Sequence, residues 1–267
     1  MPRYEYPSLR QGLVGAWCPS LGGTLADRSG RGNYASIGGL AIESQRGFLC
    51  MTNRLGGSSS SSLAVPLLGD ISATISMYAR QDNTSFTVLG GLGTSGTTGS
   101  GFFIATNGGN TFQLGFTTVS FSSGTVSSLS AWAHLCAVKS PGPLNTTARL
   151  FFNGAEVSGS SASTTVPNVL SSSFFLCDYG ANLGAYRGTT AIDDVRVYNR
   201  ALTPAEIRLL ASRRGIGLTP LPDRAAGLPR RFSVNVGGTW LAADSYVNVG
   251  GVWRLGQPSV NVGGVWK

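Results

Sequence analysis

The sequence predicts an all-β protein, an antiparallel sandwich or barrel, that ends in a small repeat module. Short apolar runs recur along most of the chain, and the loops between them are too short for the crossovers that parallel strands require. Hydrophobic residues make up 42% of the chain and charged residues only 12%, with 38 glycines. That composition is typical of many short strands joined by tight turns. A third observation is a seven-residue motif that occurs three times near the C-terminus.

The N-terminal part begins with an arm at residues 1–11, which is polar and aromatic and contains two prolines. Such an arm either frays or docks on a neighbour. The first strand is expected at Leu13–Trp17, a short apolar run. A turn-rich segment follows at 27–33, and Gly56–Ser62 reads as a flexible Gly/Ser loop.

The strands of the main domain follow at close intervals. Residues 71–80 alternate between polar and apolar side chains, so Ile71, Ala73, Ile75 and either Met77 or Tyr78 are expected on one face. Asn153-Gly154 is the strongest two-residue hairpin signal in the chain. The remaining strands are expected at 86–89, 102–105, 111–116, 119–121, 132–138, 148–152, 155–157, 174–177 and 192–198.

One helix of about ten residues is expected after these strands. Thr203 suits the N-cap, Pro204 the first helical position and Glu206 the third, which together form a capping box. Gly215 stands where a C′ glycine is expected, after two arginines that suit the negative end of a helix. Residues 216–231 contain three prolines and are expected to form a semi-rigid linker.

The last segment, 232–267, is an internal repeat. The motif Val-Asn-Val-Gly-Gly-x-Trp begins at Val234, Val247 and Val260, a period of thirteen residues. Each copy has a hairpin signature, and a module this small seldom folds alone. The three tryptophans are therefore predicted to bury it against the main domain, a partner or other copies of the chain, with assembly favoured over each Trp covering its own hairpin. These assembly residues are Trp240, Trp253 and Trp266.

Three stretches resemble laminin-G-like, concanavalin A-like jelly rolls. They are Gly12–Trp17, the segment from Trp132–Val138 to Ala148–Val157, and Ile192–Ile207 with its Asp-Asp-Val-Arg-Val-Tyr-Asn-Arg-Ala-Leu-Thr-Pro motif. The resemblance covers residues 12–215 and implies an antiparallel jelly-roll β-sandwich. Members of this family are mostly binding modules for glycans or proteins, some of them with calcium.

The calcium expectation is weak, because Cys18-Pro19-Ser20 replaces the acidic residue that often follows the first-strand Trp in the family. Hard cations need several oxygen ligands, and no dense acidic cluster occurs. We therefore expect no metal and no other cofactor, while Asp178 and Asn182, which lie in one loop, could still contribute to ligand binding.

The C-terminal repeats resemble tails of bacteriophage structural proteins. The function that this combination implies is a component of a phage virion: a head decoration, a fibre or a tail adsorption protein that displays a lectin-like jelly roll or contacts host glycans. The expected partners are other virion proteins and further copies of the chain, in a homo-oligomer that could be a trimer. The alternative is a free carbohydrate-binding lectin module that acts at a bacterial surface.

Neither catalysis nor nucleic-acid binding is expected. The single histidine, His134, reads as a core or sheet-face residue, and Asp193 and Asp194 should point to opposite faces of one strand. The Glu-x-Asp-x-x-Glu motif of glycosidases on this fold is missing. The net charge of +8 comes from scattered arginines without interleaved aromatics, which favours ion pairs within an assembly over nucleic acid.

The remaining expectations concern the cysteines and the cellular location. The four cysteines have long, irregular spacings, so Cys136 and Cys177 read as small buried hydrophobes, and a disulfide stays an open alternative. No signal peptide and no apolar stretch long enough for a membrane span are seen. We therefore expect the protein to be made in a host cytoplasm and to reside in the virion.

Overall fold

The computed structural model consists of two units, the larger of which spans Tyr4–Thr219, while the residues from Pro220 onward belong to the smaller. The described residues are 4–33, 35–38, 40–52, 58–81, 87–93, 101–107, 111–116, 119–125, 129–157, 159–160, 164, 166–169, 173–176, 190–219, 232–236, 239–243, 246–249, 252–255, 261–262 and 265–266.

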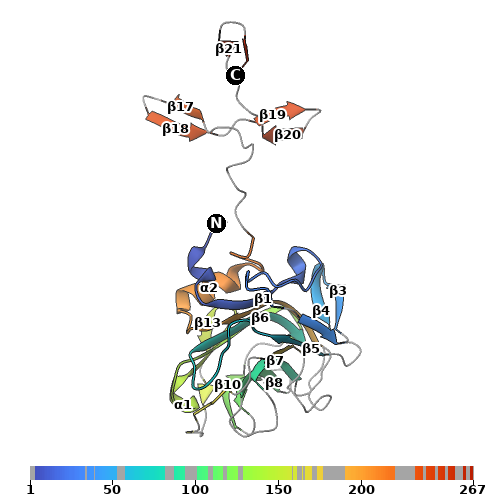
Figure 1. Ribbon diagram of the computed structural model, residues 1–267, viewed down its shortest axis with the longest axis vertical. Coiled ribbons are helices and arrows are strands. Elements are labelled where there is room, and N and C mark those ends of the chain that lie inside the picture. The colour runs from blue at the N-terminus through green and yellow to red at the C-terminus, as the bar shows by residue number, and fades with distance from the viewer. Residues whose placement is uncertain are drawn as a thin grey trace. The chain divides into compact units, whose positions relative to one another are not determined.

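The larger unit is a sandwich of two antiparallel sheets (Figure 1). The strands of the first sheet, in spatial order, are β13 (Ala155–Val157), β12 (Ala148–Phe152), β11 (Ala133–Lys139), β6 (Ala73–Gln81), β16 (Thr190–Tyr198), β4 (Phe48–Thr52) and β3 (Ala41–Gln45), and β1 (Leu13–Trp17) also pairs with β16. The long strands β6 and β16 lie at its centre and every residue of β16 is buried. The predicted antiparallel jelly-roll β-sandwich is confirmed.

The second sheet lies face to face with the first. Its strands, in spatial order, are β14 (Gly159–Ser160), β10 (Val119–Thr125), β9 (Thr111–Phe116), β8 (Gly101–Asn107), β7 (Thr87–Gly93), β15 (Ser173–Leu176), β5 (Ser58–Ser62) and β2 (Ala35–Gly38). The expected flexible loop at Gly56–Ser62 is wrong for its serines. They form β5, which is held by backbone pairing with β15 on one side and β2 on the other.

The main hydrophobic core fills the space between the sheets. Trp17 of the first sheet stacks on Phe174 of the second, with ring centroids 5.5 Å apart and planes at 1°. The predicted inward face of 71–80 is confirmed, because Ala73, Ile75 and Met77 belong to this core and Ile71 packs against it. The alternative, Tyr78, lies on the helix side, where its hydroxyl donates to the carbonyl of Ala211 at 2.7 Å. Burying a large apolar side chain contributes roughly 1.5–3 kcal/mol, so this layer is the main source of cohesion between the sheets.

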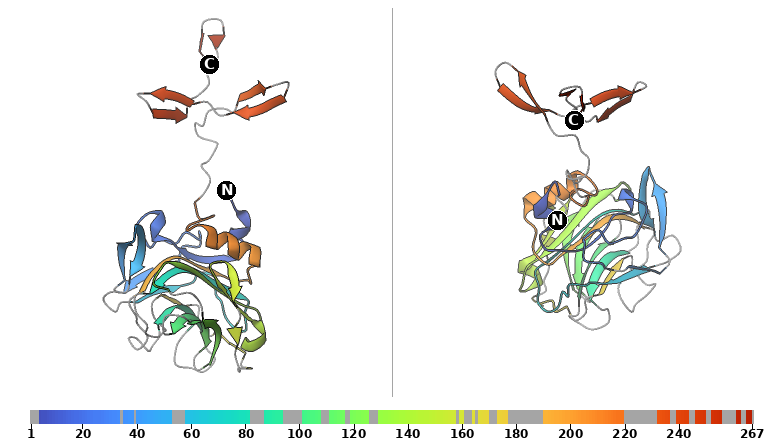
Figure 2. Two further views of the ribbon diagram at one scale, coloured as in Figure 1. Left: turned by 180° about the vertical axis from the view of Figure 1, so that it is seen from behind. Right: turned by 45° about the horizontal axis from the view of Figure 1, so that its top comes forward.

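A second hydrophobic cluster lies on the outer face of the first sheet, the face directed away from the second sheet. The helix α2 (Pro204–Ser212) packs there through Ile207 and Leu210, beside Leu9 of the 3₁₀ helix η1 (Pro7–Arg10). Figure 2 shows this helix lying across the sheet. Three short helical turns were not expected from the sequence: η1, η2 (Pro19–Leu21) and α1 (Leu144–Thr147).

The capping box of α2 is confirmed. The backbone N–H of Glu206 donates to Thr203 Oγ1 at 3.3 Å, and the backbone N–H of Thr203 donates to the Glu206 carboxylate at 2.9 Å. The predicted C′ position of Gly215 is wrong, since the C-cap is Arg213 and Gly215 follows two residues later with φ 71°.

The chain around this helix is more tightly packed than an arm and a linker would be. Leu9, from the expected N-terminal arm, is buried, as are Ile216 and Leu218, from the start of the expected linker. These apolar side chains belong to the second cluster, so residues 4–11 and 216–219 lie within the larger unit.

The C-terminal unit contains three separate hairpins. They are β17 (Phe232–Val236) with β18 (Thr239–Ala243), β19 (Tyr246–Val249) with β20 (Val252–Leu255), and β21 (Asn261–Val262) with β22 (Val265–Trp266). Each is a two-stranded sheet of its own among the described residues.

Candidate functional site

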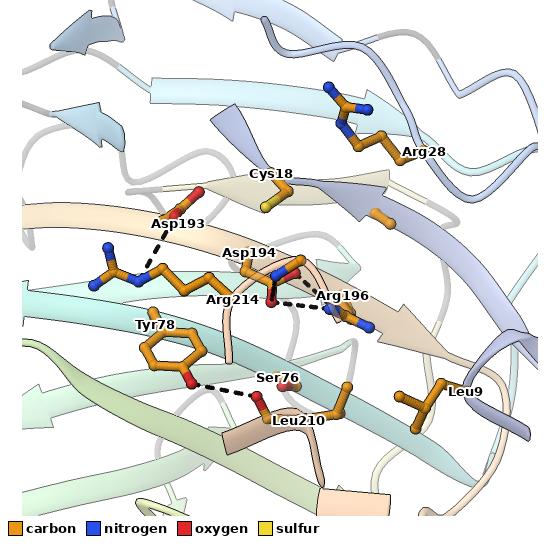
Figure 3. A network of polar contacts seen from close by, with 12 residues as sticks. Leu9, Cys18, Arg28, Ser76, Tyr78, Asp193, Asp194, Arg196, Leu210 and Arg214 are labelled. Atoms are coloured by element: carbon orange, nitrogen blue, oxygen red, sulfur yellow. Dashed lines mark hydrogen bonds and ion pairs between the residues drawn. The ribbon is translucent and has the colours of Figure 1, made fainter. Parts of the chain in front are cut away.

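Two adjacent carboxylates, Asp193 and Asp194, form the centre of a buried polar network on the outer face of the first sheet (Figure 3). Strict alternation would put them on opposite faces, and that prediction is wrong. Asp194 has φ 48°, and the register of β16 against β6 shifts between Asp193 and Arg196. This irregularity is a β-bulge, which re-aims a side chain by inserting one extra residue. Both carboxylates therefore meet groups on the helix side of the sheet.

Asp194 holds the chain that follows α2. Its carboxylate accepts two hydrogen bonds from Arg196, at 2.8 and 2.9 Å, and a third from the backbone N–H of Gly215 at 2.7 Å. Arg196 is 1% exposed. Burial alone would lower the pKa of Arg196, but the charge and the hydrogen bonds of Asp194 raise it above its ordinary value. Arg196 therefore keeps its positive charge in a dry environment.

Asp193 faces a second arginine, Arg214, at 3.7 Å from Nε to Oδ2. The Arg214 guanidinium lies over three aromatic rings, with centroid distances of 3.9 Å to Phe48, 4.1 Å to Trp132 and 4.9 Å to Tyr78. Burial raises the pKa of Asp193 and lowers that of Arg214. A guanidinium enclosed by rings and one carboxylate is an arrangement that fixes a segment in place, and it leaves Asp193 inaccessible to a substrate.

His134 also lies on this face, in β11 beside Tyr78. Its Nε2 is 2.9 Å from Ser76 Oγ, and its Nδ1 has no hydrogen-bond partner in the part of the chain that the structure describes. Burial lowers the pKa of His134 to about 4. A Ser–His contact resembles a nucleophile with its base, but the imidazole is 1% exposed and a catalytic histidine is normally oriented by a third group. The geometry is that of a buried sheet-face histidine.

An open cavity of about 390 Å³ lies between the β12–β13 hairpin and α2. Its lining residues are Phe151, Asn153, Gly154, Ala155, Glu156, Pro204 and Arg208. Phe151 is buried, whereas Asn153, Glu156 and Arg208 are exposed. The size is within the usual range of small-ligand sites, roughly 300–1,000 Å³, which combine apolar walls with a few convergent polar groups.

The hairpin tip is held rigidly against the helix. Asn153 has φ 48° and Gly154 φ 80°, as a two-residue turn of type I′ requires. A Cβ on Gly154 would lie 3.0 Å from Ala211 Cβ and 3.1 Å from Arg208 Cα, so only glycine lets the turn approach α2 this closely. Asn153 Oδ1 accepts from the backbone N–H of His134 at 2.9 Å, which leaves its amide nitrogen as a donor.

The polar rim of the cavity contains side chains of both negative and positive charge. Glu156 pairs with Arg149 of the neighbouring strand through two hydrogen bonds, at 2.7 and 2.5 Å. Hydrogen bonding to Arg149 lowers the pKa of Glu156. Arg208, on the facing turn of α2, is exposed. Sequence reasoning found the turn at Asn153-Gly154 but not the cavity, because nothing local in the sequence places this turn against the helix.

The structure describes only some of the residues that were predicted to form sites. Asp178, Asn182 and Cys177 lie outside the described residues. Register places Trp240, Trp253 and Trp266 opposite Asn235, Asn248 and Asn261, one pair in each hairpin.

The three described cysteines lie in the interior of the larger unit. Cys18, Cys50 and Cys136 are buried free thiols, and burial raises the pKa of each. Within the described ranges, His, Cys, Asp and Glu nowhere gather in a group of three that could hold a metal ion. Likewise, none of the helices described has the length and apolar character needed to cross a membrane.

Comparison with protein families gives one match. A laminin G family model, described as the concanavalin A-like lectin/glucanases superfamily, matches residues 55–208. No curated protein matches the chain.

Solved structures with a similar fold include several toxin domains. The chain is similar to the binding domain of Paraclostridial Mosquitocidal Protein 1, with a TM-score of 0.57 and 15% identity over 93% of this chain and 68% of that one. It is also similar to the receptor binding domain of botulinum neurotoxin D, with a TM-score of 0.57 and 11% identity over 88% and 64% of the two chains.

A third similar structure is of botulinum neurotoxin type C, which depends on interaction with two ganglioside molecules to get into cells. Its TM-score is 0.56 and its identity 14%, over 78% of this chain and 52% of that one. The chain thus spans about half the length of the first toxin chains that it resembles. At these identities the likeness shows a shared fold.

Proposed function

From the premise that the chain belongs to the concanavalin A-like lectin/glucanases superfamily, we propose that it is a non-catalytic, glycan-binding component of a bacteriophage particle. The jelly roll contacts the glycan, and the C-terminal repeats take part in assembly. Fold alone does not imply function, so the proposal depends on a site. A free lectin module acting at a bacterial surface is the alternative, and it shares the same glycan contact.

The observation that carries the glycan contact is the cavity between the β12–β13 hairpin and α2. Sugars present hydroxyl groups that both donate and accept hydrogen bonds, next to apolar ring faces. Arg208 and the amide of Asn153 supply donors, Glu156 supplies acceptors, and Pro204 supplies apolar wall. The hairpin and the helix are both regular elements, and a site on regular elements is better preorganised than one on loops.

The non-catalytic part of the proposal is supported by how the carboxylates of the described residues are used. Glycoside hydrolysis needs two carboxyl groups that flank the scissile bond, roughly 5–9.5 Å apart. Asp193 and Asp194 are buried and engaged with Arg214, Arg196 and backbone groups, and Glu206 is engaged in the cap of α2. Glu156 is the one carboxylate that lines the cavity, and it lacks a second carboxylate there.

The test is binding of the full chain to a panel of immobilised neutral and acidic oligosaccharides. Arg208→Ala should weaken binding at least about tenfold, because a hydrogen bond from a charged group is worth roughly 1.5–3 kcal/mol. Ala155→Trp should also abolish binding by filling the cavity. The matched control is Arg213→Ala, which removes an exposed arginine from the end of the same helix, outside the cavity.

The outcomes separate the parts of the proposal. Binding that is unchanged in both cavity variants would contradict the site, and no binding on the whole panel would contradict the glycan contact. Release of shortened oligosaccharides during the assay would contradict the non-catalytic assignment.

Membership of a phage particle is supported by the combination of this jelly roll with the three repeats, which resemble C-terminal tails of bacteriophage structural proteins. Mass spectrometry of particles purified from a lysate that expresses the chain checks this part. We expect the intact chain to co-purify with the particles at a constant ratio through successive gradients. Recovery only in the soluble fraction would favour the free lectin module.

A further inference from the structure

We propose that the three C-terminal hairpins are equivalent docking modules for copies of this same chain, and that each hairpin pairs through its free strand edges with hairpins of other copies. The inference deepens the proposed function by naming the partner of the repeats, and it rests on that function only in assigning them to assembly. Its partner is a second copy of the chain, recognised by backbone pairing between strands of like sequence.

The first observation is that the three hairpins have one common register. Val236 pairs with Thr239, and the same position is occupied by Val249 with Val252 and by Val262 with Val265. The next pair away from the turn is Asn with Trp in all three hairpins. The repeated sequence therefore produces one repeated backbone unit, and whatever surface one hairpin presents is presented three times by each chain.

The second observation is that each hairpin is incomplete as a sheet. Among the described residues the three hairpins are two-stranded sheets with no strand shared between them. An isolated two-stranded hairpin is marginally stable at best in water, and three or more strands are needed for independent stability. Both edges of such a hairpin carry backbone N–H and C=O groups that can pair with a further strand.

The third observation is that the strands lack the side chains that normally protect an edge. Proteins blunt exposed edges with lysine, proline, inward charges or bulges. The strands of the C-terminal unit contain no lysine and no proline in their described residues, and Arg254 is their one charged residue. Valine and tryptophan, which favour strands, are frequent in them. A sequence of this kind favours pairing with another strand.

These observations point to copies of the same chain rather than to a different protein. From Phe232 onward the sequence contains only Asp244, Arg254 and Lys267 as charged residues, so two copies bring little like charge together. Self-complementary surfaces are the usual basis of closed symmetric oligomers. Because each chain carries three such modules, the second and third contacts form at high effective concentration. Three weak hairpin contacts thereby give one stable assembly.

The experiment measures the mass of the full chain in solution by light scattering, with substitutions at equivalent positions of the three repeats. The triple variant Asn235→Lys, Asn248→Lys and Asn261→Lys places one positive charge in each hairpin, and like charges directly opposite one another are destabilising in a sheet. We expect the full chain to be a discrete oligomer and this variant to be a monomer. The matched triple variant with threonine at the same positions keeps strand propensity without charge and should remain an oligomer.

A second variant tests the equivalence of the repeats. Deletion of Val247–Ser259 removes one complete period of the sequence. The stoichiometry should be unchanged, and the apparent Kd for assembly should rise at least about tenfold, because one of three linked contacts is lost. A monomeric full chain, or an oligomer that persists in the lysine variant, would overturn the inference. Glycan binding by the monomeric lysine variant, at unchanged affinity per site, shows that the proposed function survives separately.

Discussion

Two arginine–carboxylate pairs of the larger unit have almost the same geometry and opposite surroundings. Arg196 and Asp194 form two parallel hydrogen bonds on the outer face of the first sheet, beneath the chain that follows α2. Arg149 and Glu156 form two parallel hydrogen bonds between β12 and β13, at the edge of the same sheet. The side chains of the first pair are 1% and 2% exposed, and those of the second 42% and 47%.

The difference shows that hydrogen-bond geometry alone does not decide what an ion pair contributes. In an exposed pair, each charge is already well stabilised by water, so the ion pair adds little to the free energy of unfolding. A buried pair must replace all the water that it has lost, and removing one partner leaves the other charge uncompensated in a dry site. Asp194 also holds Gly215, so its loss would release the chain that leaves the helix as well as a charge.

The strongest way to break this comparison is to substitute Asp194. Asp194→Ala leaves Arg196 buried without its carboxylate, so the free energy of unfolding should fall by about 3–5 kcal/mol. Denaturant titration of the full chain, followed by circular dichroism, measures the change.

The control is the double variant Asp194→Ala with Arg196→Met. Because it removes both charges, it should be more stable than the single variant. A loss below about 1 kcal/mol for the single variant would mean that Asp194 behaves as an exposed residue.

The histidine on the same face sharpens the comparison through pH. Burial lowers the pKa of His134 from 6.5 to about 4, so between these values the unfolded chain binds a proton that the folded chain does not. Stability is therefore lost as the pH falls from about 6.5 toward 4, by up to about 3 kcal/mol in total. Because the chain has one histidine, the imidazole signals in a proton NMR titration report this residue alone.

The effects of other groups on this face must be distinguished from that of His134. The charge of Asp194 raises the pKa of His134, and the charge of Arg196 lowers the pKa of His134. Asp193 acts in the opposite sense on stability, because its raised pKa lets the folded chain bind a proton before the unfolded chain does. The variant His134→Gln should lose the part of the pH dependence that belongs to the imidazole. An imidazole that titrates near its ordinary value would contradict a dry outer face.

The smallest effect is expected at the exposed pair. Arg149→Ala should change the free energy of unfolding by less than about 1 kcal/mol, because solvent already screens the charges. The same denaturant titration at low and high salt measures it, and the small effect should shrink further at high salt. A loss as large as that of Asp194→Ala would remove the distinction between the two pairs.

Local chemistry in the sequence was enough for the elements whose signals are local. The capping box at Thr203 and Glu206 predicted the start of α2, and Asn153-Gly154 predicted the β12–β13 turn, because in both cases a few neighbouring residues fix the backbone. Strand β5 could not be predicted in this way. Its five serines have no apolar pattern, and the strand exists because β15 and β2 pair with it on both sides.

Predicting the site would have required contacts between residues that are even farther apart in the sequence. Alternation assigned Asp193 and Asp194 to opposite faces, because a single extra residue at a bulge cannot be read from a pattern of period two. Arg214 meets Phe48, Tyr78 and Trp132 only after four distant segments have folded together. The cavity is likewise created by the approach of Gly154 to α2.

The thirteen-residue period of the C-terminal hairpins has a consequence at the level of the gene. Each period of thirteen residues is encoded by a whole number of codons, and the copies of the seven-residue motif have nearly the same amino acids. Recombination between two such stretches keeps the reading frame and adds or removes one complete hairpin. Related chains are therefore expected to differ in the number of these hairpins while keeping the same jelly roll.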